Sequence, residues 1–377
     1  MSAPAESIPL FHPTRTVAME QAALDVLRSG QIATGPAVPE FERAFGEIVG
    51  SAHVVATSDM TSALVLALRL AGVQRGDEVA TLAFSCLSSN SPIAILGARA
   101  RWIDVDAATL SMDPVDLAHQ LTPKTRAVMV YHVAGYPARM AEIAAICRAR
   151  GIALIEDCNN ALGASLDGGP VGRHADYAIY SFYPNRQINA LEGGALVCPD
   201  ADTAARARRL RRFGIDTTTF RDDRGEINAA SDVPEMGWSA SFGHLNAAMA
   251  LAQLSDLPDH GRRTAANAAR LAMHLRNTPG IRVVTPVPGA VPAYWGFLIF
   301  ARRRDELLAA LKLAGIRASV LHHRNDDYSG FQAERRDLSG TTRVMEELIA
   351  LPCGWWLDDA QIDRLATTVI AESQRLR

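Results

Sequence analysis

The stretch that decides the fold reads ALIEDCNNALGA at residues 153–164 and DYAIYSFYPNRQINALEGGALV at residues 176–197. Both segments begin with a short apolar run that ends in polar residues, as buried strands of a parallel sheet do. The same pattern occurs earlier in the chain, at residues 53–56, 77–82, 101–105 and 127–131. Helical apolar spacing separates some of these runs, at residues 61–70 and 141–150. The alternation predicts an α/β fold whose mostly parallel sheet is covered by helices on both faces.

The remaining segments predict a second, smaller domain. Residues 15–48 carry helical spacing interrupted by the turn Gly35-Pro36, and residues 206–234 are charged and read as a surface excursion. A helix expected over 262–276 leads into short strands and helices, which predicts a large α/β domain over 1–250 and an α+β domain over 251–377. Trp238, Trp295, Trp355 and Trp356 either line a pocket or pack at the junction of the domains, and packing is the favoured interpretation for Trp355 and Trp356.

Composition excludes several classes of protein. The net charge is -3 and basic residues form no stripe, which argues against binding to nucleic acid or to a membrane surface. The five cysteines show no CxxC spacing, so neither a disulfide framework nor a metal site is expected. The first residues lack the pattern of a signal peptide, and the prediction is a cytoplasmic protein. Lysine occurs only at Lys124 and Lys312, so lysine chemistry has two candidates.

Polar turns follow four of the expected strands, and the carboxyl ends of parallel strands meet at one edge of a sheet. The turn before Thr61 is either an anion site at a helix N-terminus or an ordinary helix cap. Asp157 follows an apolar run, where a carboxylate can pair with a protonated ring nitrogen, hold a metal, orient a histidine or cap a loop. The other two turns hold His132 and the segment from Ser181 to Arg186.

The segment SFYPNRQINALEGGALV resembles the lysine-bearing segment of the DegT/StrS-type sugar aminotransferases, SFYPNKQ…EGG. Further resemblances follow in order along the chain: GPAVPEFERAFGEIVG, SDMTSAL, GDEVATLAFSCLSS, LTPKTRAVMVYHVAGYPARM, IEDCNNALGA, GWSASFGHLNAAMALAQL and LPCGWWLDDAQID. The resemblance covers residues 8–370. It implies the fold-type I aminotransferase architecture, with a seven-stranded sheet, a small C-terminal domain and a homodimer with shared active sites. It also implies pyridoxal phosphate as cofactor and a sugar substrate on a nucleotide carrier.

The resemblance assigns roles to individual residues. Asp157 matches the carboxylate that holds the pyridine nitrogen protonated, and Asn160 matches a position beside the ring. The phosphate-contacting positions are Thr61, Ser62 and Ser181. His132 matches the family's histidine after the preceding strand.

Five positions depart from the family pattern. Arg186 stands at the Schiff-base lysine, and a guanidinium neither attacks an aldehyde as a free amine nor shuttles protons near neutral pH. Cys86 replaces the aromatic ring that stacks on the cofactor, and Met60 replaces the glycine of the phosphate turn. Ser239 and Ser241 replace an Asn and an Arg that the neighbouring subunit is expected to lend. Five departures at one site predict a remodelled pocket.

Three hypotheses follow. In the first, an enzyme of different, non-transaminating chemistry uses Arg186 to bind a carboxylate or phosphate of a small-molecule substrate. His132, Asp157 and Cys86 are then candidates for acid, base or nucleophile, although a buried cysteine is more often a small apolar residue. In the second, the chain is a non-catalytic partner of an active homologue. In the third, it is a conventional aminotransferase carrying an inactivating arginine.

Overall fold

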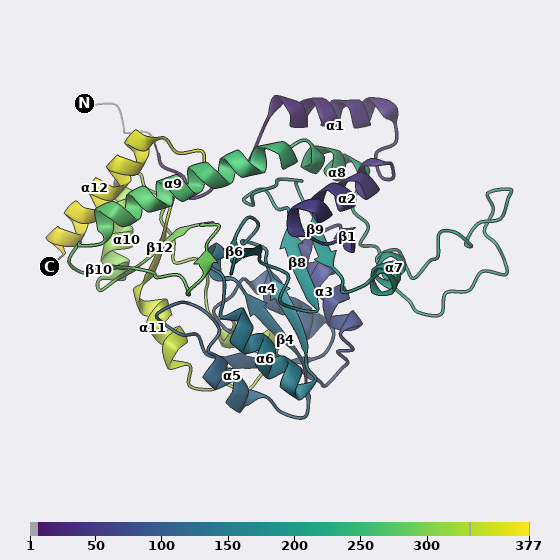
Figure 1. Ribbon diagram of the computed structural model, residues 1–377, viewed down its shortest axis with the longest axis horizontal. Coiled ribbons are helices and arrows are strands. Elements are labelled where there is room, and N and C mark those ends of the chain that lie inside the picture. Colours follow the sequence, from purple (N-terminus) through teal and green to yellow (C-terminus); the bar gives the residue numbers. More distant parts are fainter. Residues whose placement is uncertain (1–6, 332, 377) are drawn as a thin grey trace.

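The computed structural model describes residues 7–331 and 333–376 (Figure 1). In these residues a seven-stranded sheet has the strand order β1-β9-β8-β5-β4-β2-β3. The strands are β1 (Val54–Thr57), β2 (Glu78–Leu82), β3 (Arg99–Ile103), β4 (Thr125–Tyr131), β5 (Ala153–Asp157), β8 (Tyr177–Ser181) and β9 (Gly194–Val197). Only β9 among them is antiparallel to its neighbours, β1 and β8. The prediction of a mostly parallel α/β sheet is confirmed.

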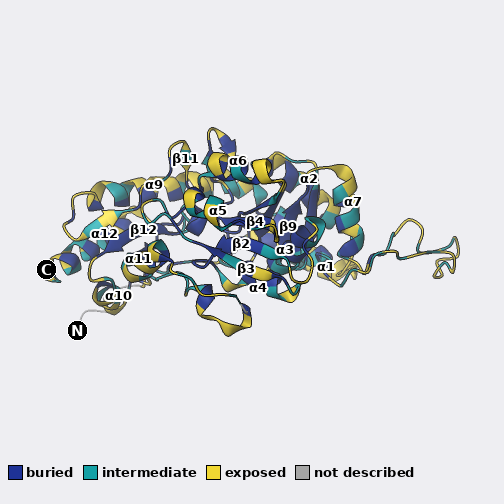
Figure 2. Ribbon diagram, turned by 90° about the horizontal axis from the view of Figure 1, so that it is seen from below, coloured by how far each residue is buried: buried dark blue, intermediate teal, exposed yellow. Residues whose placement is uncertain are grey.

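Alternate residues of the strands pack against different helices, which makes the sheet the middle of three layers (Figure 2). Val79 and Met129 pack with α3 (Met60–Leu70), α4 (Leu87–Ile95) and α7 (Ala201–Leu210). Ala80 and Val130 pack with α5 (Pro114–Gln120) and α6 (Met140–Arg150). This period-2 alternation is the expected consequence of strand geometry, since successive side chains point to opposite faces.

The N-terminal helices α1 (Val17–Ser29) and α2 (Ala37–Val49) both pack on α8 (His244–Leu251). Thr16 caps α1 by accepting the N–H of Met19, and Gly30 ends it in the left-handed conformation. Phe41 and Phe45 of α2 are fully buried against β1, β8 and β9. The turn predicted between the two helices is present.

The C-terminal part forms a smaller α+β unit on the three-stranded sheet β10-β12-β13. Its elements are α9 (Leu257–Leu275), β10 (Ile281–Val283), β12 (Phe297–Ala301), α10 (Arg304–Leu313), α11 (Ser339–Glu347), β13 (Leu348–Leu351) and α12 (Asp359–Arg375). Ile8 bonds with Gly315 and Arg317 through its backbone and is buried in this unit. The start of the chain therefore packs with the small unit, although the sequence placed it in a domain over 1–250. The boundary near residue 250 stays a prediction.

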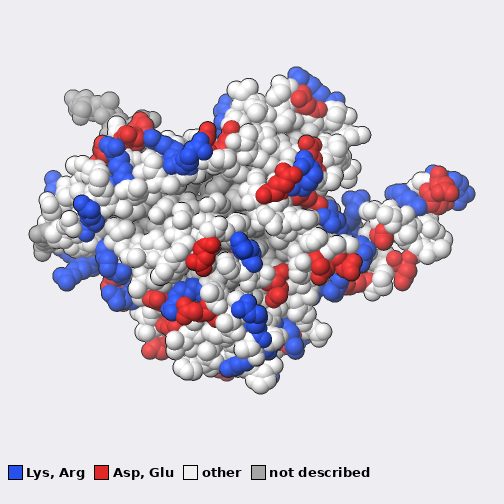
Figure 3. Space-filling model, viewed as in Figure 1, with Lys and Arg blue, Asp and Glu red and all other residues white. Residues whose placement is uncertain are grey.

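Short elements complete the described residues: β6 (Ser165–Leu166), β7 (Gly169–Pro170), β11 (Ala290–Val291) and the 3-10 segments Val133–Gly135, Leu254–Asp256, Asn325–Asp327 and Ser329–Phe331. Residues 213–236 project from the body beyond α7 (Figure 1), which confirms most of the surface excursion predicted over 206–234; its first residues are wrong, because they form the end of α7, where Ala207 and Leu210 are buried. Acidic and basic side chains are interspersed on the face in Figure 3, and both occur on this projection. Among the described helices, none combines the length and apolar character needed to cross a bilayer.

Candidate functional site

The predicted site residues gather at one edge of the main sheet. β2, β4, β5 and β8 are parallel neighbours, and β1 shares their direction because β1 and β8 are both antiparallel to β9. The carboxyl ends of these five strands carry Asp59 to Ser62, Cys86, His132, Asp157 and Ser181. Lys124 and Lys312 are exposed, and Lys124 precedes β4 at the opposite edge. Neither lysine is placed to act at this site.

The carboxylate of Asp59 occupies the N-terminus of α3. Its Oδ1 accepts the backbone N–H of Ser62 at 2.7 Å, and its Oδ2 accepts the hydroxyls of Ser58 at 2.7 Å and Ser62 at 2.8 Å. Thr61 lies in the same first turn, beside Met60. The helix-cap interpretation of this turn is therefore confirmed. A phosphate would have to compete with Asp59 for the Ser62 donors and would meet its negative charge.

Gly194 brings Ser181 close to this turn. It pairs with Thr57 on one side and with Ser181 on the other. A Cβ at Gly194 would lie 2.6 Å from the carbonyl oxygen of Asp59, so a side chain here would force the strand and the turn apart. Glu192 is close enough that burial and the charge of Asp59 raise the pKa of Glu192. Acidic groups thus surround the positions assigned to phosphate.

Asp157 ends β5 with one carboxylate oxygen unused. Oδ1 accepts the backbone N–H of Asn159 at 3.1 Å and its amide at 2.8 Å, whereas Oδ2 is buried without a hydrogen-bond partner. Burial raises the pKa of Asp157. A buried carboxylate oxygen without a partner is costly, so it can take a donor, either from a ligand or from the nearby Ser89 hydroxyl, which is also buried without a partner.

Tyr131 and His322 form a polar pair that the sequence reasoning missed. The Tyr131 hydroxyl lies 3.1 Å from His322 Nε2 and accepts the Asn160 amide at 2.6 Å. Burial lowers the pKa of His322 to about 3, helped by the nearby charge of Arg186. The histidine is therefore neutral near pH 7. Because the Tyr131 oxygen already accepts the Asn160 amide and the Ala134 N–H, its O–H is the donor and His322 Nε2 accepts the hydrogen bond. Asn160 Oδ1 remains buried without a partner.

His132 is buried with both ring nitrogens engaged. Nδ1 accepts the Ala138 N–H at 3.0 Å, so Nε2 carries the proton that it donates to Glu156 at 2.9 Å. Although burial alone would raise the pKa of Glu156, hydrogen bonds from His132 and from two backbone N–H groups lower it. This geometry favours a structural role for His132 over the predicted acid or base.

The same pair lies near Cys158, and one ligand atom from each of His132, Glu156 and Cys158 falls within 4.8 Å of the others. Zinc would need a thiolate and a free histidine nitrogen. Burial raises the pKa of Cys158 well above its usual range, and the histidine nitrogens are already bonded. We assign no metal site to this group.

Arg186 lies in the middle of the site with an unsatisfied guanidinium. Its side chain is 8% exposed, Nη1 donates to Asn185 Oδ1 at 2.5 Å, and Nε has no hydrogen-bond partner. The guanidinium carbon lies 5.1 Å from the centre of the Trp295 ring. Burial lowers the pKa of Arg186, but Tyr131 and Asp157 oppose that effect. A guanidinium stays charged under these conditions.

Cys86 stands at the N-terminus of α4, half-buried, with Sγ 3.0 Å from Ser88 Oγ. The resemblance assigns a stacking aromatic ring to this position. Phe84, two residues earlier, is fully buried and packs edge-on against His322 with ring centres 5.5 Å apart. Phe84, the aromatic residue near Cys86, thus packs against His322.

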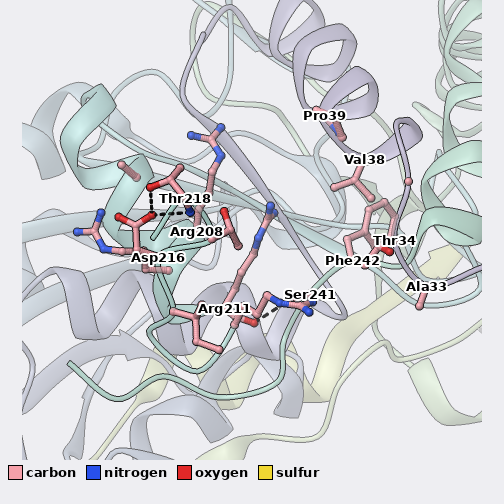
Figure 4. Close-up of a pocket in the computed structure, with 16 residues that line it drawn as sticks. Ala33, Thr34, Val38, Pro39, Arg208, Arg211, Asp216, Thr218, Ser241 and Phe242 are labelled. Atoms are coloured by element: carbon pink, nitrogen blue, oxygen red, sulfur yellow. Dashed lines mark hydrogen bonds between the residues drawn. The ribbon is translucent and has the colours of Figure 1, made fainter. Parts of the chain in front are cut away.

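A separate cavity of about 710 Å³ lies beside Ser241 (Figure 4). Arg208 and Arg211 line it, and both bind the buried Glu42. The Ser241 hydroxyl donates to the Arg211 carbonyl at 3.4 Å, and Ser239 pairs with Arg212 through its backbone. Ser241 thus lines this cavity and Ser239 lies two residues away, and the partners found for them among the described residues include Arg211 and Arg212.

The sequence matches the family model of the DegT/DnrJ/EryC1/StrS aminotransferases over residues 14–370. The chain belongs to this family. AtS13 from Actinomadura melliaura is similar at 33% identity and a TM-score of 0.92, with 98% of this chain and 100% of that chain covered. The sugar aminotransferase CalS13 from Micromonospora echinospora is 33% identical with a TM-score of 0.91, covering 97% and 99%. Spr1654 from Streptococcus pneumoniae, solved in a PLP-form, shares the fold at 22% identity, a TM-score of 0.89 and coverage of 98% and 100%.

Family membership confirms the resemblance and the fold-type I architecture. Three features of the site were invisible in the motifs. Asp59 and Tyr131 were placed only as members of polar turns, with no role of their own, and His322 lies more than 180 residues from Tyr131. The departure of Asp59 from the family's SNGTSAL was the one signal that a closer look at the sequence offered.

Proposed function

We propose that this protein is an enzyme of sugar or secondary-metabolite biosynthesis that keeps the aminotransferase fold but does not transaminate. The observation that carries the proposal is the buried guanidinium of Arg186, whose Nε lacks a partner. In this proposal Arg186 binds a carboxylate or phosphate of a small-molecule substrate. The space around Arg186 then holds the substrate where the resemblance places a cofactor.

The residues present do not suit a covalently held pyridoxal phosphate. The chain supplies no amine at position 186, and the exposed Lys124 lies at the opposite edge of the sheet. Asp59 uses Ser62 donors at the N-terminus of α3 and adds a negative charge there. Asp157 keeps a group that fits, because its Oδ2 is buried without a partner and could accept a ring N–H. Thr61, Asn160 and Ser181 also keep the residue types that the family resemblance assigns to the cofactor, but none of them supplies the covalent link.

Two residues remain candidates for proton transfer or nucleophilic attack. Asp157 has a free oxygen, and its pKa is raised by burial toward the range useful to an acid or base. Cys86 is half-buried and lies close enough to Arg186 and Tyr131 to influence the pKa of each. His132 is no longer a candidate acid or base, because both of its ring nitrogens form hydrogen bonds, one to Glu156 and one to the backbone of Ala138.

The alternatives have specific weaknesses. A conventional aminotransferase inactivated at position 186 would not need a carboxylate at the phosphate position, as Asp59 provides. A non-catalytic partner that completes a homologue's site would need the polar groups that Ser239 and Ser241 replace. The inactivated conventional enzyme is an outcome of the experiment below, and a non-catalytic partner would instead be inactive and co-purify with an active homologue.

The test compares the purified chain with Arg186→Lys after incubation with pyridoxal phosphate. Borohydride reduction fixes any Schiff base, and the intact mass reports it. We expect no adduct on the unaltered chain, and no amino transfer to keto sugars. An adduct on the unaltered chain, or robust transamination by it, would refute the proposal. Full transaminase activity in Arg186→Lys would support the inactivated conventional enzyme instead.

We also propose a cytoplasmic homodimer. The five cysteines are free, as in a reducing compartment. Exposed apolar side chains occur on α1 and on the projecting segment, including Leu27 at 50%, Ile227 at 63% and Met236 at 68%. Such exposed apolar side chains are available to be covered by a second copy of the chain. Light scattering of the purified chain tests the dimer, and a monomeric mass at micromolar concentration would contradict it.

A further inference from the structure

A cleft of about 450 Å³ opens between the segment around Arg186 and the start of α9. We call it the aromatic cleft and define it by Arg186, His260, Trp295, Trp355 and Trp356, which all line it. The sequence favoured junction packing for Trp355 and Trp356 and left Trp295 open between packing and lining a pocket, and all three are only partly buried. A cleft of this size suits a small organic ligand.

The walls of the aromatic cleft are flat rings held in place by neighbours. His260 stacks on Trp355 with ring centres 4.5 Å apart and planes 11° from parallel. Trp295 stacks on Phe11 at 4.0 Å, and its Nε1 donates to the Asn185 carbonyl at 2.7 Å. Burial lowers the pKa of His260, so this ring is neutral near pH 7. Rigid aromatic walls favour a planar ligand, since they lose little freedom on binding.

Charge decides which planar ligand fits. Among the described residues that line the aromatic cleft there is no Asp or Glu, and the charged ones are Arg186 and Arg262. Arg262 is paired with Asp259 and its side chain is 71% exposed, so it stays at the rim. Arg186 is buried, and its Nε donor has no partner. Gln187 Oε1 and His260 Nδ1 are also buried without partners.

We infer that the aromatic cleft binds an aromatic monocarboxylate, with the carboxylate on Arg186 and the ring against the tryptophans. This inference rests on the proposed function, because it requires Arg186 to be a ligand-binding group. One buried guanidinium balances one negative charge, and its planar fork matches a carboxylate. A diphosphate carries more charge than the single buried arginine can offset, so a nucleotide is disfavoured.

The test measures binding to the full chain by titration calorimetry. The probes are naphthoate, its neutral amide naphthamide, acetate and uridine diphosphate. We expect saturable binding of naphthoate, with naphthamide and acetate each at least about tenfold weaker, because one lacks the charge and the other lacks the ring. Arg186→Gln should weaken naphthoate by about 10- to 100-fold. Arg282→Gln is the matched control, since Arg282 also lies over a ring, Phe300 at 4.0 Å, outside the aromatic cleft.

Equal affinities for naphthoate and naphthamide would overturn the inference, and this comparison needs no variant that must fold. Unchanged binding in a folded Arg186→Gln would also overturn it, as would absence of naphthoate binding. Tighter binding of uridine diphosphate that displaces naphthoate would replace the monocarboxylate by a nucleotide. The proposed function fails on a different readout, the borohydride-fixed mass of the unaltered chain.

Discussion

The sharpest prediction concerns Asp59 and is best tested in an Arg186→Lys background. That background supplies an amine, so pyridoxal phosphate can be captured and its affinity measured. Asp59→Asn then removes one negative charge at the N-terminus of α3. The asparagine keeps a side-chain oxygen that can accept the Ser62 N–H, which Asp59 accepts at 2.7 Å in the unaltered chain. Asn and Asp cap helices about equally well, so the fold should be preserved.

The magnitude follows from electrostatics. Two unit charges roughly 6 Å apart at an effective dielectric constant of about 20 repel by about 3 kcal/mol. Asp59 is half-buried, and screening by solvent reduces this figure. Since about 1.4 kcal/mol corresponds to a factor of ten in Kd, Asp59→Asn should tighten pyridoxal phosphate binding by about 10- to 100-fold.

The assay is a titration of both Arg186→Lys proteins, with absorbance of the bound chromophore as the signal. Pyridoxal, which lacks the phosphate, is the matched ligand control and should gain little from Asp59→Asn. Asp200→Asn is the matched protein control, since Asp200 caps α7 in the same way, accepting the Thr203 N–H at 2.7 Å. The reasoning is refuted if Asp59→Asn leaves the affinity unchanged or improves pyridoxal equally.

Three further predictions concern stability, each measured as the free energy of unfolding in urea. Glu156→Gln should cost about 3 kcal/mol at pH 7, because one amide cannot accept all of the buried N–H groups of His132, Gly172 and His174 that the carboxylate accepts. The pKa of Glu156 is lower in the folded protein than its ordinary 4.5. The stability that the ionised Glu156 contributes is therefore fully present above pH 4.5 and is lost as the pH falls through the folded pKa. In Glu156→Gln the free energy of unfolding should no longer show this decrease at acidic pH. Glu42→Gln should cost about 3 kcal/mol, whereas Glu47→Gln on the same helix, whose pair is exposed, should cost less than about 0.5 kcal/mol. Asp358→Ala should cost about 1 kcal/mol by removing the capping box of α12; an unchanged midpoint would contradict the cap.

Prediction from sequence worked best where local pattern and structure coincide. The helices expected over 61–70 and 141–150 are α3 (Met60–Leu70) and α6 (Met140–Arg150), and the strand expected over 127–131 is β4 with two more residues. Local spacing missed α4, whose segment carries Pro92 and little periodicity. It also missed β13, a short apolar run that only its pairing with β12 makes a strand.

The site divides in the same way. Residue types and their order placed Asp157, Ser181 and Arg186 together, because parallel strands bring their carboxyl ends to one edge wherever they stand in the chain. The sequence also settled that position 186 lacks an amine. Only the tertiary structure decided that both ring nitrogens of His132 form hydrogen bonds within the protein and that His322 lies within hydrogen-bond distance of Tyr131. Hydrogen-bond partners and burial depend on residues distant in sequence, and these set each group's charge and availability.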